Sequence, residues 1–491
     1  MIKTIVQQLA DFATGVDFAE LPVAVVEESK RILLDSIGCA LAGTEHPKGR
    51  IGIEYGRLIG GDGNATFIGA DERVSIFGAA FANGELINAL DFDAVLPLGH
   101  VSPYVLPGAL AVAETVGSSG KDLISAVALS HEMSFRIGKA MDYLRDTKDG
   151  AVSPPKVYGY SNTIFGATAA IALLKRLPKD IVPYALGIAG CISPVNSHWC
   201  WVQHAPSTTI KYLMAGPLTQ AAMTAAYMAE LGHRGDLRVL DDREFVFPRF
   251  IGSVRWEPAR ITDKLGAEWN FPAEASYKPY PHCRILHALL DTLIEIVEKN
   301  DINPEEVDGI KVLIEGFTEQ PIWLNNDIGH VTDAQFSVAH GIELGAHRLP
   351  PGKIWQDPTT VFSPSLMRLM RKVTAELHPD YVKHLNNHPA SRPARVELRS
   401  RGEMFVGERI YPKGSPSPDP ASTMTTDELV GKFRRNAEGM IAAERLDTVV
   451  DTILNLEKVR DFASVMRQMG RSATSVSNSQ HQAFPEQRHL A

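Results

Sequence analysis

Lys211 is the residue whose surroundings point most directly to chemistry. It is the only charged residue in a stretch of apolar, small and neutral polar residues from about position 187 to position 229. Burial in such surroundings disfavours the ammonium form, lowers the pKa of a lysine and can make its amine a base near neutral pH. The alternative is a lysine without a catalytic role, which runs its apolar stem along the protein and keeps its charge in water.

Four polar and aromatic side chains stand just before this lysine: His198, Trp199, Trp201 and His204. They are suited to line a pocket for a flat or aromatic substrate, with His204 in contact with it. Equally, they are suited to a structural loop whose tryptophans fill the core. The sequence leaves both interpretations open.

The elements that must position Lys211 are helices. Apolar and small residues recur at helical spacing through the first 260 or so residues. The pattern predicts helices over 25–41, 76–90, 106–116, 123–137, 163–174, 184–192 and 211–231. Their alanines and glycines allow helices to approach closely, which favours an all-α core.

The pattern changes after about Trp256. A short β-type run at 310–314 and a hairpin of 395–399 with 404–410 are separated by predicted helices at 287–299, 335–344 and 365–374. This alternation predicts an α+β domain with a small antiparallel sheet. A rigid Ser/Pro connector at 415–420 precedes two more helices, at 426–435 and 443–456.

The fold class that we expect is therefore multidomain α and α+β. An all-helical domain begins with residues 1–265, an α+β domain spans 266–412, and 421–465 returns to the helical domain. The polar residues 472–491 are typical of a disordered tail.

Composition excludes several classes of function. The chain has 491 residues and a formal net charge of −9, and its basic residues form only short pairs, so we expect no nucleic-acid partner. It shows no signal peptide and no membrane-spanning run, which favours a cytoplasmic protein without a membrane partner. Its four cysteines lack metal-ligand spacing, which indicates buried, reduced thiols and no metal site.

Several motifs, taken in order, resemble the MmgE/PrpD family, whose members include dehydratases, decarboxylases and epimerases. The resemblance covers roughly residues 5–460 and implies a large helical domain, a smaller α+β domain and a homodimer. It also implies an active site between the domains that needs no cofactor and acts on di- and tricarboxylates. The motifs lie at 33–43, 80–84, 89–93, 100–103, 132–138, around Lys211, at 278–283 and at 334–338.

The resemblance assigns site residues one by one. The acidic segment of the family matches Asp91 and Asp93, but its fourth position is Ala94 here and the Thr or Ser that often follows is Val95. The histidine of the family's His-Pro-Ser motif matches His100.

The remaining positions are matched only in part. A second family histidine falls on Tyr160, and the family lysine falls on Lys211. The family's Lys-x-x-Pro segment begins at Lys278. The position at which the decarboxylases carry histidine falls on Cys283, with His282 beside it.

The chemistry needs a base and a positive charge, because a proton on a carbon next to a carboxylate is hard to remove. Lys211 and Lys278 offer charge, His100 offers an imidazole, and Asp91 or Asp93 can orient either. Tyr160 can be the opposing acid or base if a neighbouring lysine lowers its pKa. We expect Lys211, His100, Asp91 and Tyr160 to be catalytic, and Asp93, Lys278, His282 and His204 to bind substrate.

These side chains also have readings without catalysis. The two aspartates can cap a helix, His100 can be a solvated loop residue, and Tyr160 can be a packing residue. On balance the chain is expected to be a cofactor-free lyase for a small carboxylic acid, a hydro-lyase like 2-methylcitrate dehydratase. The alternatives are a decarboxylase, an epimerase, or a non-catalytic protein that binds a small molecule on the same fold.

Overall fold

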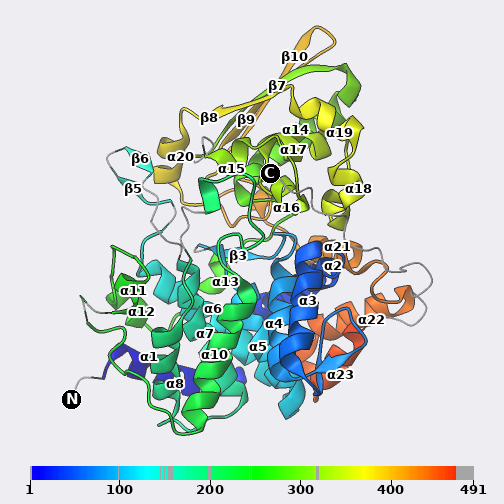
Figure 1. The fold of residues 1–491 in the computed structure, drawn as a ribbon. Coiled ribbons are helices and arrows are strands. Elements are labelled where there is room, and N and C mark those ends of the chain that lie inside the picture. Colours follow the sequence, from blue (N-terminus) through cyan, green and yellow to red (C-terminus); the bar gives the residue numbers. More distant parts are fainter. Residues whose placement is uncertain are drawn as a thin grey trace, which may run out of the picture.

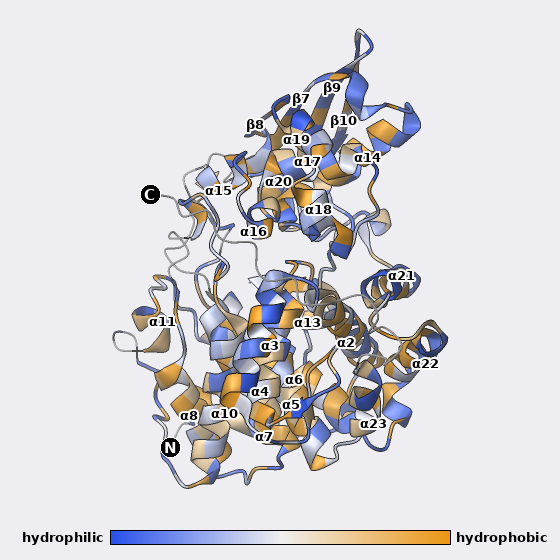
Figure 2. Cartoon of the chain, turned by 45° about the vertical axis from the view of Figure 1, so that its right-hand side comes forward, coloured by the Kyte–Doolittle hydropathy of each residue, from blue (hydrophilic) through white to orange (hydrophobic). Residues whose placement is uncertain are grey.

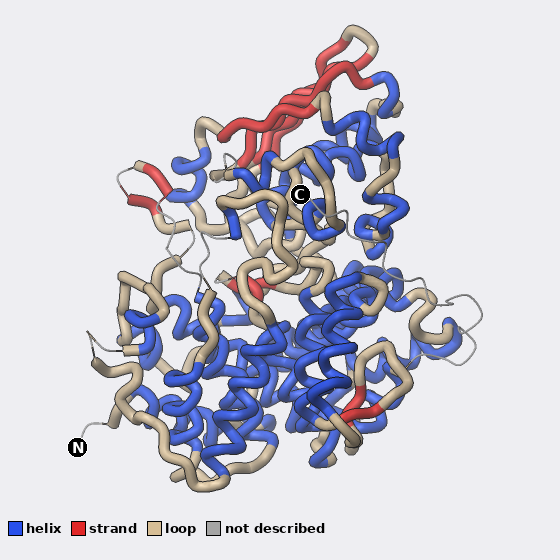
Figure 3. The backbone as a smooth tube through the Cα atoms, viewed as in Figure 1, coloured by secondary structure: helices blue, strands red, loops and turns tan. Residues whose placement is uncertain are grey.

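The computed structural model describes residues 3–97, 99–143, 145–148, 150–152, 159–196, 201–242, 244, 246–316 and 320–470. The chain forms a broad helical body and a smaller part that carries the sheet at the far end of the molecule (Figures 1 and 3). The predicted fold class, a large helical domain with a smaller α+β domain, is thus confirmed. The predicted tail at 472–491 lies outside the described residues.

The helical body is built from nine described helices of the first 230 residues. They are α1 (Ile5–Gly15), α2 (Val23–Gly43), α3 (Pro47–Gly60), α4 (Ile76–Asn88), α5 (Ser102–Val116), α6 (Gly120–Lys139), α7 (Thr163–Leu174), α8 (Val182–Ile192) and α10 (Ala215–Glu230). Helix α4 is central, because it packs against α2, α3, α5 and α10. Helices such as α5 and α7 are hydrophobic over most of their surface, as expected of buried helices (Figure 2).

Glycine explains how closely these helices pack. A methyl group on Gly216 of α10 would lie 2.5 Å from the ring of Phe81 on α4, and one on Gly166 of α7 would lie 2.3 Å from the carbonyl oxygen of Ser130 on α6. Larger residues at these two positions would push the helices apart. The alanine and glycine content therefore sets the distance between the elements that carry the site.

The chain returns to the helical body near its end. Helices α21 (Thr426–Ala437) and α22 (Ala443–Leu454) pack against α2, and the short α23 (Ala463–Met466) touches α5. A capping box formed by Thr425 and Glu428 starts α21. Helices α21 and α22 present polar outer faces (Figure 2).

The second part holds a four-stranded sheet in the order β10–β9–β7–β8. Its strands are β7 (Val307–Ile314), β8 (Val373–Leu377), β9 (Ala394–Ser400) and β10 (Glu403–Arg409), with α14 (His287–Lys299), α17 (Val338–Ala346), α19 (Pro364–Met370) and α20 (Tyr381–Asn387) around them. The predicted β9–β10 hairpin is present. The expectation of a purely antiparallel sheet is wrong, because β7 and β8 pair in parallel. The long helical connection between them supplies the crossover that a parallel pair requires.

Other expected boundaries also shift. Residues 373–377, assigned in part to a helix at 365–374, form β8. The helix expected over 211–231 begins only at Ala215, because the backbone of Lys211 has φ +56°, which a right-handed helix cannot contain. In the helical body the described strands are two-residue pairs: β1 (Ala65–Thr66) with β2 (Arg73–Val74), β3 (Val95–Leu96) with β4 (Gly99–His100), and β5 (Thr147–Lys148) with β6 (Ala151–Val152).

Short helices complete the described chain: α11 (Phe247–Phe250), α12 (Ala259–Thr262), α13 (Phe271–Glu274), α15 (Pro321–Leu324), α16 (Val331–Ala334) and α18 (Pro358–Val361). Within the described part, no helix has the length and apolar character needed to cross a bilayer. Of the cysteines that the structure describes, Cys39 is buried, Cys283 is partly buried and Cys191 is exposed, so the expectation of buried thiols is wrong for Cys191.

Candidate active site

Asp91 lies at the centre of a cluster of charged and aromatic side chains. It follows the end of α4 in a tight turn, is buried, and has φ +54°. Lys211, which faces it, has φ +56°. A left-handed backbone at two non-glycine residues costs of order 1 kcal/mol each and persists only where the surroundings enforce it. Such strain is common at functional sites.

The Asp91 carboxylate has four charged or polar neighbours, namely two lysines, a tyrosine and His100, whose Nε2 lies 3.4 Å from Oδ1. The Nζ of Lys278 donates to its Oδ2 at 2.6 Å, the hydroxyl of Tyr212 donates to its Oδ1 at 2.8 Å, and the Nζ of Lys211 lies 3.7 Å from Oδ1. Burial opposes ionisation here, but the charges of Lys278, Lys211 and His100 outweigh it and hold the pKa of Asp91 well below its usual range. Asp91 is therefore a fixed negative charge that orients its neighbours.

Lys211 is fully enclosed, with 1% of its surface exposed. Its ammonium donates to the backbone carbonyls of Asn88 at 2.8 Å and Ala89 at 3.3 Å. Burial lowers the pKa of Lys211 to about 7, against the attraction of Asp91. The reading of a lysine that reaches water along its stem is thus wrong, and the amine is poised to exchange a proton near neutral pH.

His100 and Asp93 form a second acid–base pair. The Nδ1 of His100 lies 2.6 Å from Oδ2 of Asp93, and its Nε2 lies 3.4 Å from Oδ1 of Asp91 and 3.5 Å from Nζ of Lys278. His100 is buried, so it is not a solvated loop residue. Asp93 therefore orients the imidazole through Nδ1, and Nε2 points between the Asp91 carboxylate and the Lys278 ammonium.

Two tyrosines enclose this pair. The ring of Tyr212 stacks on His100 with centroids 4.7 Å apart, and Tyr160 stacks on Tyr212 at 4.9 Å. Burial, together with the charge of Asp91, raises the pKa of Tyr160 well above its usual value. The condition under which Tyr160 was expected to be a base, a pKa lowered by lysine, is therefore not met. Its phenol stays protonated and can therefore act as an acid but not as a base.

Helices α2 and α21 and the sheet-containing part of the chain all contribute residues that hold the Asp91 loop in place. Lys432 of α21 donates to Asp35 of α2 at 2.7 Å and to the carbonyl of Phe92 at 2.6 Å. From the sheet-containing part, Gln335 donates to the carbonyl of Ala89 at 2.8 Å and Gln356 donates to that of Leu90 at 2.7 Å. The cluster therefore lies where the helical body meets the second part.

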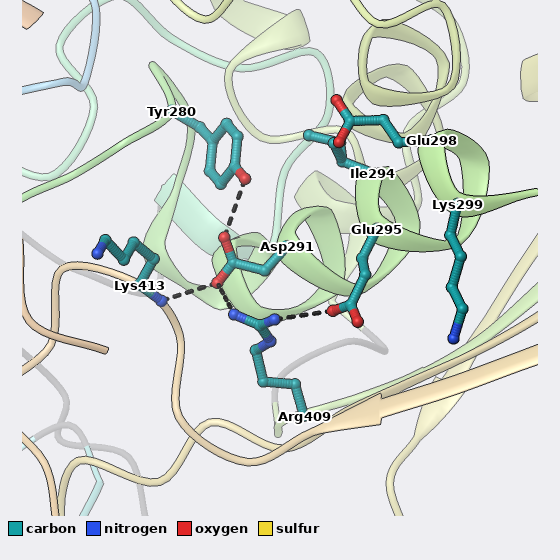
Figure 4. Close-up of a pocket in the computed structure, with 8 residues that line it drawn as sticks. All are labelled: Tyr280, Asp291, Ile294, Glu295, Glu298, Lys299, Arg409 and Lys413. Carbon is teal, nitrogen blue, oxygen red and sulfur yellow. Dashed lines mark hydrogen bonds and ion pairs between the residues drawn. The ribbon is translucent and has the colours of Figure 1, made fainter. Parts of the chain in front are cut away.

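Lys278 reaches the cluster through a backbone bridge. Val95 of β3 and Ser276 exchange two backbone hydrogen bonds of 2.8 Å, which holds the segment of Lys278 beside the Asp91 loop. Two residues later, Tyr280 turns the other way and donates to Asp291 at 2.9 Å, in an outer pocket of about 610 Å³ (Figure 4). The segment thus separates the Asp91 cluster from that pocket.

Two expected substrate-binding residues stand apart from the cluster. The His282 ring faces α17, where a methyl group on Gly341 would lie 3.1 Å from its Nε2, and burial lowers its pKa to about 3. His204 is exposed to solvent. Within the described part of the chain, no hydrogen bond or ion pair joins either imidazole to Asp91, although the charges of Asp91 and Lys278 act on His282. Their expected roles remain predictions.

The aromatic cluster before Lys211 is described in part, because His198 and Trp199 lie outside the described residues. Trp201 is buried and packs edge-on against Tyr212, Trp323 and Phe336, with ring centroids 5.0–5.7 Å apart. This arrangement favours a tryptophan that fills the core behind Tyr212. Burial, followed by the charge of Asp91, raises the pKa of the Cys283 thiol to about 11, so it stays protonated.

Sequence reasoning missed four residues of the site. Tyr212 touches Asp91 directly, while Asn88, Glu85 and Lys48 stand behind it. Tyr212 could have been found from its place beside Lys211. The other three carried no signal, because they are joined to Tyr212 and its neighbours only by contacts between segments far apart in the sequence.

Comparisons with known proteins agree with this architecture. The family model described as the MmgE/PrpD N-terminal domain matches residues 7–259, and the MmgE/PrpD C-terminal domain matches residues 280–457. Cis-aconitate decarboxylase of Mus musculus is 23% identical over 95% of this chain and 93% of its own length. That of Homo sapiens is 23% identical over 94% of this chain and 93% of its own length. A cis-aconitate decarboxylase-like protein of Aspergillus oryzae is 24% identical over 94% and 96% respectively.

Proposed function

Because the chain belongs to the MmgE/PrpD family, we propose that it is a lyase that removes a carboxyl group from a di- or tricarboxylic acid. The curated relatives reported above are named as decarboxylases or decarboxylase-like, which supports a carboxy-lyase ahead of the hydro-lyase expected from the sequence. The observation that carries the proposal is the geometry of the site. Two buried lysines and a buried tyrosine, Lys278, Lys211 and Tyr212, surround the Asp91 carboxylate and place several proton donors in one enclosed cluster.

Decarboxylation needs such a site because it consumes a proton. The bond between the carboxylate carbon and its neighbour breaks, carbon dioxide leaves, and the electron pair on the neighbouring carbon must take a proton. Burial keeps the phenols of Tyr160 and Tyr212 protonated, and Lys211, with a pKa of about 7, readily gives and regains one. A carbanion beside a second carboxylate is stabilised by nearby positive charge.

The side chains take distinct roles under this proposal. Lys278 binds a substrate carboxylate and stabilises the developing charge, while Lys211 delivers the proton to carbon. His100, oriented by Asp93, exchanges that proton with its surroundings. Asp91 holds both lysines and Tyr212 in place.

A hydro-lyase is the second candidate, and the Asp93–His100 pair favours it. Dehydration requires a base for the carbon-bound proton and an acid for the departing hydroxyl, and Nε2 of His100 is suited to be that base. An epimerase has less support, because it needs an acid and a base on opposite faces and Tyr160 stays protonated.

The experiment is a panel of di- and tricarboxylic acids in heavy water, followed by NMR, with cis-aconitate first because the relatives are named for it. We expect release of carbon dioxide and one deuterium at the carbon that lost it. Lys211→Met should abolish the release. Lys30→Met is the matched control, because Lys30 of α2 is also buried but its ammonium pairs with Glu27 and Glu457.

Three outcomes would contradict the proposal. A new alkene from a hydroxy acid without release of carbon dioxide would establish a hydro-lyase. Deuterium exchange without net reaction would establish an epimerase. Silence across the panel, with thermal stabilisation by one of the acids, would establish a binding protein.

We further propose that the partner of this chain is a second copy. Helix α3 exposes Ile51, Tyr55 and Leu58, spaced by four and three residues on one face, and Leu58 is 83% exposed. Such an apolar stripe on a body helix is costly to leave in water and fits a symmetric interface between two copies.

A further inference from the structure

Another buried lysine, Lys48, contacts the same asparagine as Lys211. Lys48, near the start of α3, lies 3.3 Å from a carboxylate oxygen of Glu85 on α4, and both side chains are almost completely enclosed. The other oxygen of Glu85 accepts the backbone N–H of Gly216 at 2.8 Å. Gly216 is in the first turn of α10, directly after the segment that carries Lys211 and Tyr212.

Asn88 joins the two lysines. The Nζ of Lys48 donates to the side-chain oxygen of Asn88 at 2.9 Å, and the Nζ of Lys211 donates to its backbone oxygen at 2.8 Å. The side-chain nitrogen of Asn88 donates to the hydroxyl oxygen of Tyr212 at 2.7 Å. One residue at the end of α4 thus touches both ammonium groups and the tyrosine that binds Asp91.

Lys48 also fixes the direction of this chain of hydrogen bonds. An ammonium group can only donate, so the amide oxygen of Asn88 must face Lys48 and the amide nitrogen must face Tyr212. Tyr212 therefore accepts from Asn88 and gives its own proton to Asp91. Without a donor at position 48 the amide loses one of the contacts that set its orientation, and it keeps its donation to Tyr212 and, at 3.4 Å, to Oδ1 of Asp93.

We propose that the buried pair Lys48–Glu85 acts through Asn88 as a positioning and charge-setting unit that controls when Lys211 carries a proton. The proposal rests on the proposed function for its catalytic meaning, but not for its test. Lys48 is a positioning residue, because its hydrogen bonds and ion pair among the described residues go to Asn88 and Glu85 and not to Asp91 or His100.

The charges around Lys211 make this control effective. Burial is the main cause of its lowered pKa; Asp91 opposes it, and the like charges of Lys48 and then Lys278 add to it. His46 stays neutral, because burial and the charge of Lys211 lower its pKa well below the usual value. The groups that face Lys211 are Asp91 and Asp93 from the loop after α4, Lys48 and His46 from the start of α3, Lys278 from its own loop, and the ring of Phe336.

The two partners of the pair act in opposite directions. Lys48→Met removes a positive neighbour, so Lys211 should keep its proton to a higher pH. Glu85→Gln removes the charge that partly neutralises Lys48, so Lys211 should lose its proton at a lower pH, while the glutamine oxygen can still accept from Gly216. Each shift should be on the order of one pH unit, the size produced by a charge about 10 Å away at an effective dielectric constant near 20.

The test reads the protonation of Lys211 without substrate. The free energy of unfolding is measured by urea denaturation between pH 6 and pH 9.5, with and without Lys211→Met, in wild type, Lys48→Met, Glu85→Gln and the variant with both changes. In each background, the free energy of unfolding of the Lys211→Met form is subtracted from that of the form with Lys211. The pH at which this difference begins to rise reports the titration of Lys211. Lys30→Met is the matched control and should leave this pH unchanged.

Opposite shifts in the two single variants, with the double variant between them, support the proposal. Shifts in the same direction, or none, overturn it, because a merely structural loosening affects both variants alike. Where Lys48→Met does not fold, Glu85→Gln alone tests the proposal: a titration of Lys211 at lower pH supports it, and a titration at the same or higher pH overturns it. If no acid is turned over but the shifts occur, the proposed function fails and this inference stands. If turnover is present but the shifts are absent, only this inference fails.

Discussion

Replacing Lys211 by methionine should change how the stability of the folded chain depends on pH. The folded pKa of Lys211 is about 7, and an unfolded lysine titrates near 10.4. Between these values the unfolded chain binds a proton that the folded chain does not, so the free energy of unfolding rises with pH. Below about pH 7 both states hold the proton and the folded state bears the full cost of burying it.

The magnitude follows from the slope of about 1.4 kcal/mol per pH unit where the two states differ by one proton. Starting at the midpoint near pH 7, the contribution by pH 9 is roughly 2 kcal/mol. Methionine has a similar length and no charge, so the variant lacks this rise. We expect the variant to be the more stable one at pH 6, and its advantage to shrink by roughly 2 kcal/mol between pH 7 and pH 9.

Urea denaturation at 25 °C, followed by tryptophan fluorescence, measures the difference at each pH. Lys30→Met serves as the control, because it removes a buried lysine whose ammonium is paired with two carboxylates. A flat difference for Lys211→Met, or one that falls with pH, would refute the claim that Lys211 is buried with a weakly held proton.

Three further predictions concern activity and assembly. Lys211→Ala should keep the fold and lower kcat at least about 100-fold, and Lys211→Arg should not restore it, because a guanidinium holds its proton too firmly; steady-state kinetics beside circular dichroism checks both. Tyr212→Phe should lower kcat about 10- to 100-fold with little change in KM, the scale of a hydrogen bond to the charged Asp91, and a drop in affinity alone would contradict this role. Light scattering at micromolar concentration should give twice the chain mass of 53.7 kDa. The double variant Tyr55→Glu/Leu58→Glu should give the mass of a single chain, because it places charges in the apolar stripe of α3. A monomeric wild type would refute the proposed interface.

The helices were accessible from the sequence because their apolar spacing is a local property. The start of α10 was not, because Lys211 is forced into a left-handed backbone by contacts with Asn88 and Ala89, more than 120 residues away. Strand β8 was missed for a similar reason. Its residues lie beside β7 only through a long crossover, and their own pattern does not distinguish a strand from a helix.

The site residues also differ in whether their properties follow from the local sequence or from long-range contacts. A lone lysine among apolar residues carries its desolvation cost in the local sequence, so the burial of Lys211 could be predicted. What that burial does depends on Lys48, Glu85 and Asn88, which α3 and α4 bring together and which no spacing rule joins to position 211. The direction of the His282 ring depends likewise on the space left by Gly341 on a distant helix. A sequence can therefore show that a charge is buried, whereas the long-range neighbours decide whether that charge holds its proton. At this site those neighbours come from α3, α4 and the loops of Asp91 and Lys278.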